Sequence, residues 1–151
     1  MPKIKDILKQ KSQSAIWSVG PSLSVFQAIE MMALKEVGAL TVVDDEGHLI
    51  GIISERDYAR KVILLGKSSK QTPVSEIMTK DVITINEDSR IEECMTLMTE
   101  RRIRHLPVVH DSFLIGMISV GDLVKTIISE QDFKIEQLER YVRGEEAGSL
   151  H

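Results

Sequence analysis

The sequence predicts an α/β protein in which two β-α-β-β-α units pack about a pseudo-twofold axis, with a C-terminal helical tail. The first observation behind this fold class is an internal duplication, because residues 16–58 align with residues 82–123 with their apolar positions in register. The second is that both copies combine helical apolar spacing with short continuous apolar runs, which are typical of strands covered on both faces.

The first copy supplies every element of the unit in order. We expect a short strand over residues 17–19 and a helix after Ser24. Two apolar strands, residues 39–43 and 49–53, flank a polar turn, and a second helix follows Ser54.

The second copy repeats this plan. A strand is expected over residues 82–85, a helix after Ser89, strands over 106–109 and 114–118, and a helix after Ser119. The period is longer than that of ordinary solenoid repeats, so the copies are interpreted as half-domains that share one core.

Serine residues mark the starts of both first helices. Ser24 with Gln27, and Ser89 with Glu92, fit the S-x-x-E/Q capping box, in which side chains and backbone satisfy each other's free donors. Both pairs therefore predict a helix N-terminus directly after the serine.

The repeats leave a linker and two flanking segments. Polar and helix-breaking residues indicate the linker, within which residues 74–78 are expected to form one helical turn. The tail is expected to be helical to about Arg143. The predicted organisation is a helical lead-in (1–14), repeat one (15–66), a linker (67–80), repeat two (81–129), and a C-terminal helix and tail (130–151).

Composition excludes several classes of protein. The net charge of −4 disfavours a DNA-coating protein, which needs a broad basic surface, and 4% aromatic residues disfavour a stacking platform for single strands. No apolar stretch is long enough to span a membrane, and no secretion signal is evident. The single cysteine, Cys94, favours a reducing compartment, so we expect a cytoplasmic protein without membrane or nucleic-acid partners.

The same motif follows in both copies, at the end of the second strand of each hairpin. Residues 51–57 and 116–122 both fit the pattern G-h-h-[ST]-x-x-D, and residues 103–109 fit the approach to the preceding strand. With these motifs in register, residues 15–129 resemble a tandem pair of CBS domains, also called a Bateman module.

The resemblance implies a function. Such pairs bind adenine-containing nucleotides in clefts between the repeats and act as sensors or regulators, so no enzyme activity is expected. The sequence does not choose among AMP, ADP, ATP, NAD and S-adenosylmethionine as the ligand. An interaction module that has lost its ligand, or a cryptic nucleotide-modifying enzyme, are the alternatives.

The chemistry of the motif is consistent with that role. Ser54 stands at a helix N-terminus, where free N–H groups and the positive dipole end favour a phosphate. Asp57 lies one turn on and can accept from ribose hydroxyls, and Ser119 and Asp122 repeat the arrangement. Capping of the helix is the alternative role for the same residues.

The resemblance also implies a wider set of contacts. Adenine would lie against residues 37–40 or 103–106, and Ser18 and Thr84 are candidates for hydrogen bonds to it. The two sites are not expected to be equivalent, because Gly121 replaces Arg56, which is either a phosphate ligand or a solvated residue. The implied nucleotide-binding residues are Ser18, Gly38, Ala39, Leu40, Ser54, Arg56, Asp57, Thr84, Ile103, Arg104, His105, Leu106, Pro107, Ser119 and Asp122. No metal site is expected, because the histidines and Cys94 show no ligand spacing.

The tail suggests an assembly. Its apolar residues fall on an a/d-like spacing and outrun the repeat pair: Val124, Ile128, Ile135, Leu138 and Val142. We expect a homodimer that signals to a regulated protein of unknown identity. The alternative is a tail that folds back on its own module.

Overall fold

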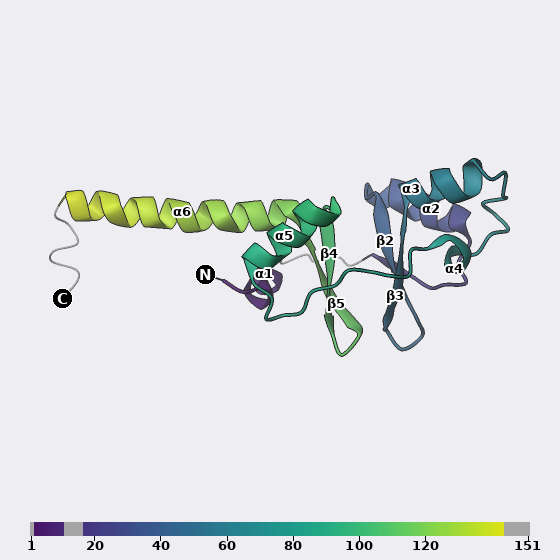
Figure 1. Cartoon of the computed structure of the whole chain (residues 1–151), viewed down its shortest axis with the longest axis horizontal. Helices are drawn as coiled ribbons and strands as arrows, with labels where there is room; N and C mark the ends of the chain where they lie inside the picture. The colour runs from purple at the N-terminus through teal and green to yellow at the C-terminus, as the bar shows by residue number, and fades with distance from the viewer. Residues whose placement is uncertain (1, 11–16, 144–151) are drawn as a thin grey trace.

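The computed structural model describes residues 2–10 and 17–143 as two α/β repeats side by side, with one long helix projecting from the second (Figure 1). Repeat one contains β1 (Ser18–Val19), α2 (Val25–Lys35), β2 (Ala39–Val43), β3 (Leu49–Ser54) and α3 (Glu55–Tyr58), which continues as the π-helical turn η1 (Ala59–Ile63). Repeat two contains α5 (Ile91–Arg101), β4 (His105–His110), β5 (Phe113–Ser119) and α6 (Val120–Val142). Two further helices, α1 (Ile4–Gln10) and α4 (Val74–Ile77), precede them.

The predicted α/β architecture is confirmed. In repeat one β1 pairs parallel with β2, and β2 pairs antiparallel with β3. In repeat two β4 and β5 form the matching antiparallel hairpin. Both hairpins shift register at the same place, between Val42 and Val43 and between Val108 and Val109, so the two copies share a backbone irregularity as well as an apolar pattern.

The strand predicted over residues 82–85 is wrong in extent, because only Ile85 forms a bridge, to Val108. The reason lies in the neighbouring strand. In repeat one the backbone N–H of Thr41 donates to the carbonyl of Trp17 at 3.3 Å. Pro107 stands at the position equivalent to Thr41 and has no N–H to donate, so the ladder is shorter by that hydrogen bond.

Of the two capping serines predicted for the first helices, one is confirmed and the other is wrong. Ser24 caps α2, and its Oγ accepts from the backbone N–H of Gln27 at 3.1 Å. The N-cap of α5 is Arg90, with no side-chain cap, whereas the Oγ of Ser89 accepts from the N–H of Asn86 at 3.1 Å. The duplication places Arg90 opposite Ser24, so Ser89 stands one residue too early and closes the preceding turn instead.

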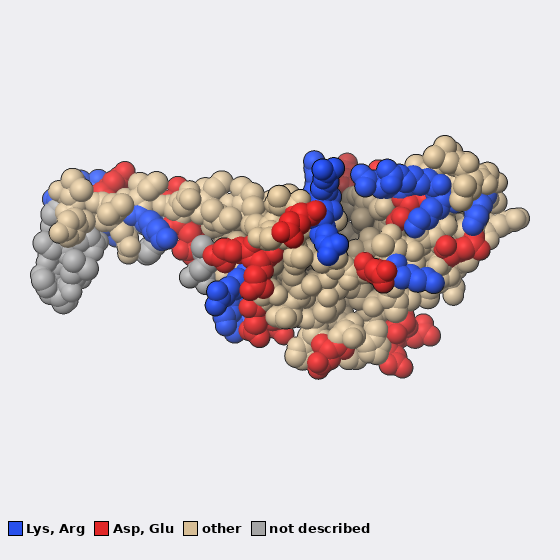
Figure 2. Space-filling view, viewed as in Figure 1, with Lys and Arg blue, Asp and Glu red and all other residues tan. Residues whose placement is uncertain are grey.

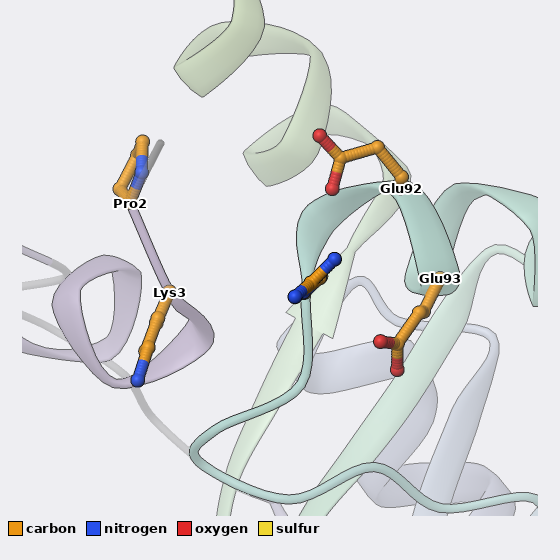
Figure 3. Close-up of a pocket in the computed structure, with 5 residues that line it drawn as sticks. Pro2, Lys3, Glu92 and Glu93 are labelled. Atoms are coloured by element: carbon orange, nitrogen blue, oxygen red, sulfur yellow. The ribbon is translucent and has the colours of Figure 1, made fainter.

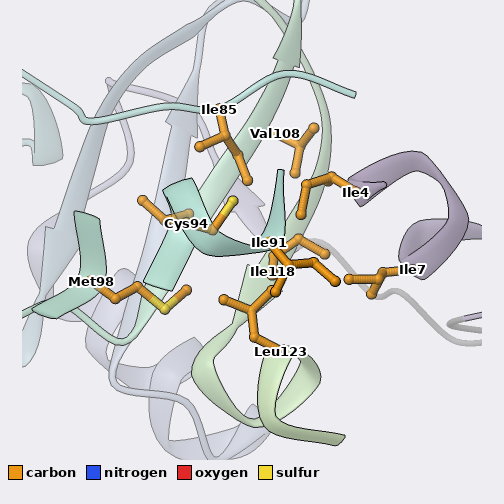
Figure 4. Packing of buried hydrophobic residues seen from close by; sticks show 10 residues of the cluster. Ile4, Ile7, Ile85, Ile91, Cys94, Met98, Val108, Ile118 and Leu123 are labelled. Carbon is orange, nitrogen blue, oxygen red and sulfur yellow. The ribbon is translucent and has the colours of Figure 1, made fainter. Parts of the chain in front are cut away.

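Each repeat has its own apolar core, so the prediction of one core shared by both copies is wrong, and each core includes a helix from outside the predicted repeat. In repeat two, Ile4 and Ile7 of α1 pack among the side chains shown in Figure 4. In repeat one, Val74 and Ile77 of α4 take the corresponding place. The predicted single turn over residues 74–78 is thus confirmed as α4, and it completes the core of repeat one.

The helices α1 and α4 are equivalent elements of the duplication. The N–H of Ile4 donates to the carbonyl of Ser89 at 3.4 Å, and the N–H of Val74 donates to that of Leu23 at 2.8 Å. A Cβ added to the motif glycines would meet Leu8 of α1 at Gly116, 2.5 Å away, and Met78 after α4 at Gly51, 2.6 Å away. Residues 4–8 (IKDIL) and 74–78 (VSEIM) carry this equivalence in the sequence.

The C-terminal helix is continuous with repeat two. α6 spans 23 residues without a break at residue 129, where repeat two was predicted to end. The prediction of helix to about Arg143 is therefore confirmed. No helix in residues 2–10 or 17–143 combines the length and apolar character needed to cross a bilayer. Residues 11–14 of the predicted lead-in and the tail beyond residue 143 lie outside the described residues.

The single cysteine provides a probe of the repeat-two core. Cys94 is fully buried, and burial raises the pKa of its thiol to about 11. Because the thiolate is the reactive form, we expect an aromatic disulfide reagent at about pH 8 to label the native protein at least roughly 100-fold more slowly than the urea-unfolded chain. Equal labelling rates would show that the core around α5 opens freely.

Candidate functional site

A cavity of about 400 Å³ lies between the two repeats, where the starts of β2 and β4 approach each other. Its walls come from both halves of the duplication, as the predicted cleft between repeats requires. The lining residues are Trp17, Glu36, Val37, Gly38, Ala39, Leu40 and Ile52 from the first half and His105, Met117 and Ser119 from the second.

The apolar floor follows from strand alternation. Ile53 and Ile118 are fully buried in the cores of their own repeats. Their neighbours Ile52 and Met117 therefore point from the opposite face of each hairpin, and both line the cavity. The two hydrophobic positions of the G-h-h-[ST] motif thus have different roles, one in the core and one in the cleft.

The strand starts are tied to the helix starts in both repeats. The N–H of Glu55 donates to the carbonyl of Gly38 at 3.1 Å, and the N–H of Val120 donates to that of Arg104 at 2.9 Å. Each loop entering a central strand therefore lies against the N-terminus of the second helix. This brings predicted residues from different parts of the motif into one place.

Ser119 brings a helix N-terminus to the cavity. Its Oγ accepts from the N–H of Asp122 at 3.1 Å, and its own N–H donates to Oδ2 of Asp122 at 2.8 Å. This reciprocal box caps α6, so the capping alternative is realised for this pair. Because the N–H groups of Val120 and Asp122 already donate to Arg104 and Ser119, the helix start offers the cavity chiefly the positive end of a long helix dipole and the N–H of Gly121.

Repeat one uses the equivalent aspartate differently. Asp57 accepts from the N–H and the Oγ of Ser54, both at 3.0 Å. Its Oδ1 also accepts from Oγ1 of Thr79 at 3.3 Å and lies 3.1 Å from Nζ of Lys61. Asp57 is only 8% exposed, and Lys61 additionally donates to the carbonyl of Ile77 at 2.9 Å, so this carboxylate joins α3 to α4.

The same positions in repeat two lack that arrangement. Thr126 stands in place of Lys61, and its hydroxyl donates to the backbone carbonyl of Asp122 at 2.9 Å. Asp122 is partly buried rather than buried. The two motif aspartates therefore differ in their surroundings, as the predicted non-equivalence of the sites requires.

The structure brings together some predicted site residues and separates others. Gly38, Ala39, Leu40, His105 and Ser119 line the cavity. The Oγ of Ser18 lies 2.6 Å from Oγ1 of the buried Thr41. The remaining predicted residues are not part of this lining: Ser54, Arg56, Asp57, Thr84, Ile103, Arg104, Leu106, Pro107 and Asp122.

Sequence reasoning missed several lining residues. Ile52 and Met117 were detectable, because both stand next to the buried isoleucine of a repeated motif. Trp17 directly precedes β1, and Nζ of Lys35 lies 4.1 Å from the centroid of its ring. Glu36 caps α2 in the left-handed conformation, φ 57°, and no pattern in the sequence marks it as a lining residue.

The charge near the cavity is mixed, because Glu36 is the one Asp, Glu, Lys or Arg among the described residues that line it. Lys and Arg side chains gather along the upper edge of the molecule, over the junction of the repeats (Figure 2). Arg56 and Arg104 are both exposed. Among the described residues, no group of three or more His, Cys, Asp or Glu side chains is placed to hold a metal ion.

The hairpin tips join the two repeats at a second point. The N–H of Leu49 donates to the carbonyl of Ser112 at 3.0 Å, and the rings of His48 and Phe113 stack with centroids 4.3 Å apart. A hydrogen bond from the backbone N–H of His48 is the main cause that lowers the pKa of Asp44 at this tip. Contacts at the tips and across the cavity together fix the distance between the repeats.

A second cavity, of about 360 Å³, has less suitable chemistry. It lies between the N-terminal segment and the start of α5 and is lined by Pro2, Lys3, Arg90, Glu92 and Glu93 (Figure 3). The carboxylates of Glu92 and Glu93 oppose the two cations, so a phosphate would meet repulsion there. The cavity between the repeats is the better candidate.

Comparisons with known proteins agree with this geometry. The CBS domain matches residues 4–63 and 74–129 of the chain. The CBS domain-containing protein CBSX3, mitochondrial, of Arabidopsis thaliana is 40% identical over 149 residues, covering 93% of this chain and 72% of the relative. The crystal structure of the CBS domain of NE2398 is 44% identical with a TM-score of 0.76, covering 85% and 99% of the two chains. A crystal structure of CBSX2 in complex with AMP is 27% identical with a TM-score of 0.73, covering 87% and 99%.

Proposed function

Because this chain belongs to the CBS-domain family and carries two tandem CBS repeats, we propose that it is a regulatory module that binds an adenine nucleotide between its repeats. The observation that carries the proposal is the cavity of about 400 Å³. It brings together the start of β2, the equivalent motif residues Ile52 and Met117, and the N-terminus of α6. This volume is in the usual range of small-molecule sites. The related CBSX2, whose structure contains AMP, supports the ligand class.

The lining divides the proposed ligand into three parts. The base lies against the apolar Ile52 and Met117 and the exposed backbone of Gly38, which lacks a side chain to exclude a flat ring. The phosphate lies at the N-terminus of α6, where the N–H of Gly121 and the dipole favour negative charge. The ribose lies between them, within reach of the carboxylate of Asp122, one turn into that helix.

We propose that the repeat-two motif, not the repeat-one motif, holds the nucleotide. Ser119 of the repeat-two motif lines the cavity with His105, which adds a polar ring on the same side, whereas Ser54 of the repeat-one motif is not part of this lining. One nucleotide per chain is therefore the expected stoichiometry.

A catalytic role is not part of the proposal. His105 and Ser119 are cross-strand partners in the β4–β5 hairpin and both line the cavity, which is the strongest argument for the alternative of a nucleotide-modifying enzyme. The Oγ of Ser119, however, is engaged as the helix cap. The proposed output is a change in the module that a regulated protein recognises.

We further propose that the module is a homodimer in the cytoplasm. Ile63 and Ile128, at equivalent positions of the two repeats, are 57% and 52% exposed and offer apolar surface to a second copy. The buried, unpaired Cys94 suits a reducing compartment. The name of the relative CBSX3 places that protein in mitochondria, so imaging of a tagged chain in its own cell is the direct measurement.

Calorimetric titration with AMP, ADP, ATP and NAD tests the function. We expect heat that fits one site per chain for at least one of these ligands, and none for CMP, because the lining that faces the base is built for a purine-sized ring. Chromatography of the recovered ligand should show it unchanged. Absence of binding by all four would leave the interaction module without a ligand as the correct function, and a converted ligand would show an enzyme.

A further inference from the structure

α6 continues well beyond the repeat to which it belongs (Figure 1). Its 23 residues correspond to about 35 Å of helix at roughly 1.5 Å per residue. One stripe of apolar side chains along it is exposed: Val124 41%, Ile128 52%, Ile135 53%, Leu138 65% and Val142 82%. The described part of the tail does not fold back on its own module, so this alternative from the sequence is wrong.

The spacing of the stripe is that of a coiled coil. Steps of four and three residues connect Val124, Ile128, Gln131, Ile135, Leu138 and Val142. In heptad terms Ile128, Ile135 and Val142 are a positions, whereas Leu138 is a d position. β-Branched residues at a with leucine at d favour two parallel strands. Gln131, at the intervening d position, is the one polar side chain in the stripe.

The flanking charges distinguish the two possible orientations. Lys134 is a g position, and Asp132 and Glu139 are e positions. In a parallel pair Lys134 meets the partner's Glu139, and the symmetric contact repeats this attraction. The antiparallel pair that aligns the whole stripe would instead place Lys134 beside the partner's Lys134 and Asp132 beside the partner's Asp132. These repulsions would offset its attraction between Lys125, also an e position, and the partner's Glu139.

We propose that residues 124–142 form a parallel, in-register two-stranded coiled coil with a second copy of this chain. An isolated helix of this length, with its apolar stripe in water, would be marginally stable, and a second copy supplies the missing packing. The open hollow between Ile135, Leu138 and Val142 receives the partner's side chains. This interface does not depend on nucleotide binding.

Disulfide cross-linking tests contact and orientation together. The native Cys94 is buried and does not interfere. We expect Ile128→Cys and Val142→Cys, made separately and oxidised, both to give a covalent dimer on a non-reducing gel, because equivalent a positions face each other. Gln137→Cys, at a c position on the outer face, is the matched control and should stay monomeric. Cross-linking at only one of the two seam positions, or at neither, would overturn the parallel, in-register coiled coil, because an antiparallel pair of the whole stripe, centred near residue 133, brings neither position near its own counterpart.

Charge reversal provides an independent measurement. We expect Lys134→Glu to raise the dimer dissociation constant by roughly 3- to 10-fold in sedimentation equilibrium, because two attractions become repulsions. Adding Glu139→Lys should restore the original value. If the double variant dissociates as readily as the single one, the parallel pairing is wrong.

Discussion

Replacing Ile4 by alanine should lower the free energy of unfolding by about 2–5 kcal/mol, although Ile4 lies in a segment that the sequence marked only as a lead-in. The side chain is fully buried in the core of repeat two, among Ile91, Ile118 and their neighbours. Truncation removes three methyl or methylene groups and leaves a cavity that the surrounding strands cannot close completely. Urea unfolding followed by circular dichroism measures the change.

Two matched variants accompany this measurement. Lys5→Ala changes an exposed residue of the same helix and should cost less than about 0.5 kcal/mol. Val74→Ala removes the fully buried equivalent residue of α4 and should destabilise the protein through the core of repeat one. If Ile4→Ala were no more harmful than Lys5→Ala, α1 would not be part of the repeat-two core.

Replacing Asp122 by alanine is expected to weaken adenine-nucleotide binding by roughly 5- to 150-fold, or about 1–3 kcal/mol. The ribose hydroxyls would lose a charged acceptor placed one turn into the helix whose N-terminus we propose as the phosphate site. The same change removes the acceptor of the Ser119 N–H, so the native fold should lose about 1 kcal/mol as well. Calorimetry at a temperature well below the unfolding transition separates the two effects.

The control for this prediction is a carboxylate away from the cleft. Asp88 is exposed and lies just before the N-terminus of α5, whereas the C-terminal end of this helix leads to the cleft. Asp88→Ala should therefore bind the nucleotide as the parent does. Asp57→Ala, in repeat one, should cost stability through Lys61 and Thr79 but leave affinity within about threefold. A stronger loss of binding from Asp57→Ala than from Asp122→Ala would show that the repeat-one motif holds the nucleotide and that the proposed assignment to repeat two is wrong.

The sequence was sufficient where local patterns decide the structure. The strands at residues 39–43 and 106–109 were found because their apolar runs end at turns, and the helix starts after Ser24, Ser54 and Ser119 were found because their signals are local. It failed at residues 82–85, where a proline in a neighbouring strand removes a hydrogen-bond donor. That effect depends on which strands become neighbours.

The candidate site was predicted only in part for the same reason. Gly38, Ala39 and Ser119 followed from the motif and its resemblance. The pairing of Asp57 with Lys61 is a local i,i+4 contact that the sequence could have indicated, whereas the hydrogen bond from Thr79 could not be predicted, because it requires the segment after α4 to lie against α3 across the linker. Comparing residues 4–8 with residues 74–78 would have extended the duplication and revealed that both segments carry a core helix.

The positions of α1 and α4 in the sequence have a consequence for the order of folding. α1 precedes repeat one but packs in the core of repeat two, whereas α4 follows repeat one and packs in its core. During synthesis repeat one can close as soon as α4 leaves the ribosome, because Val74 and Ile77 follow directly on the strands they cover. Ile4 and Ile7 are made before repeat one, yet their partner Ile118 in β5 comes roughly a hundred residues later. Such distant contacts form slowly, because a long loop must close before the contacts can stabilise the chain. α1 therefore reaches its place only after repeat two has been made, and until then its apolar face is open to chaperones and to misassembly.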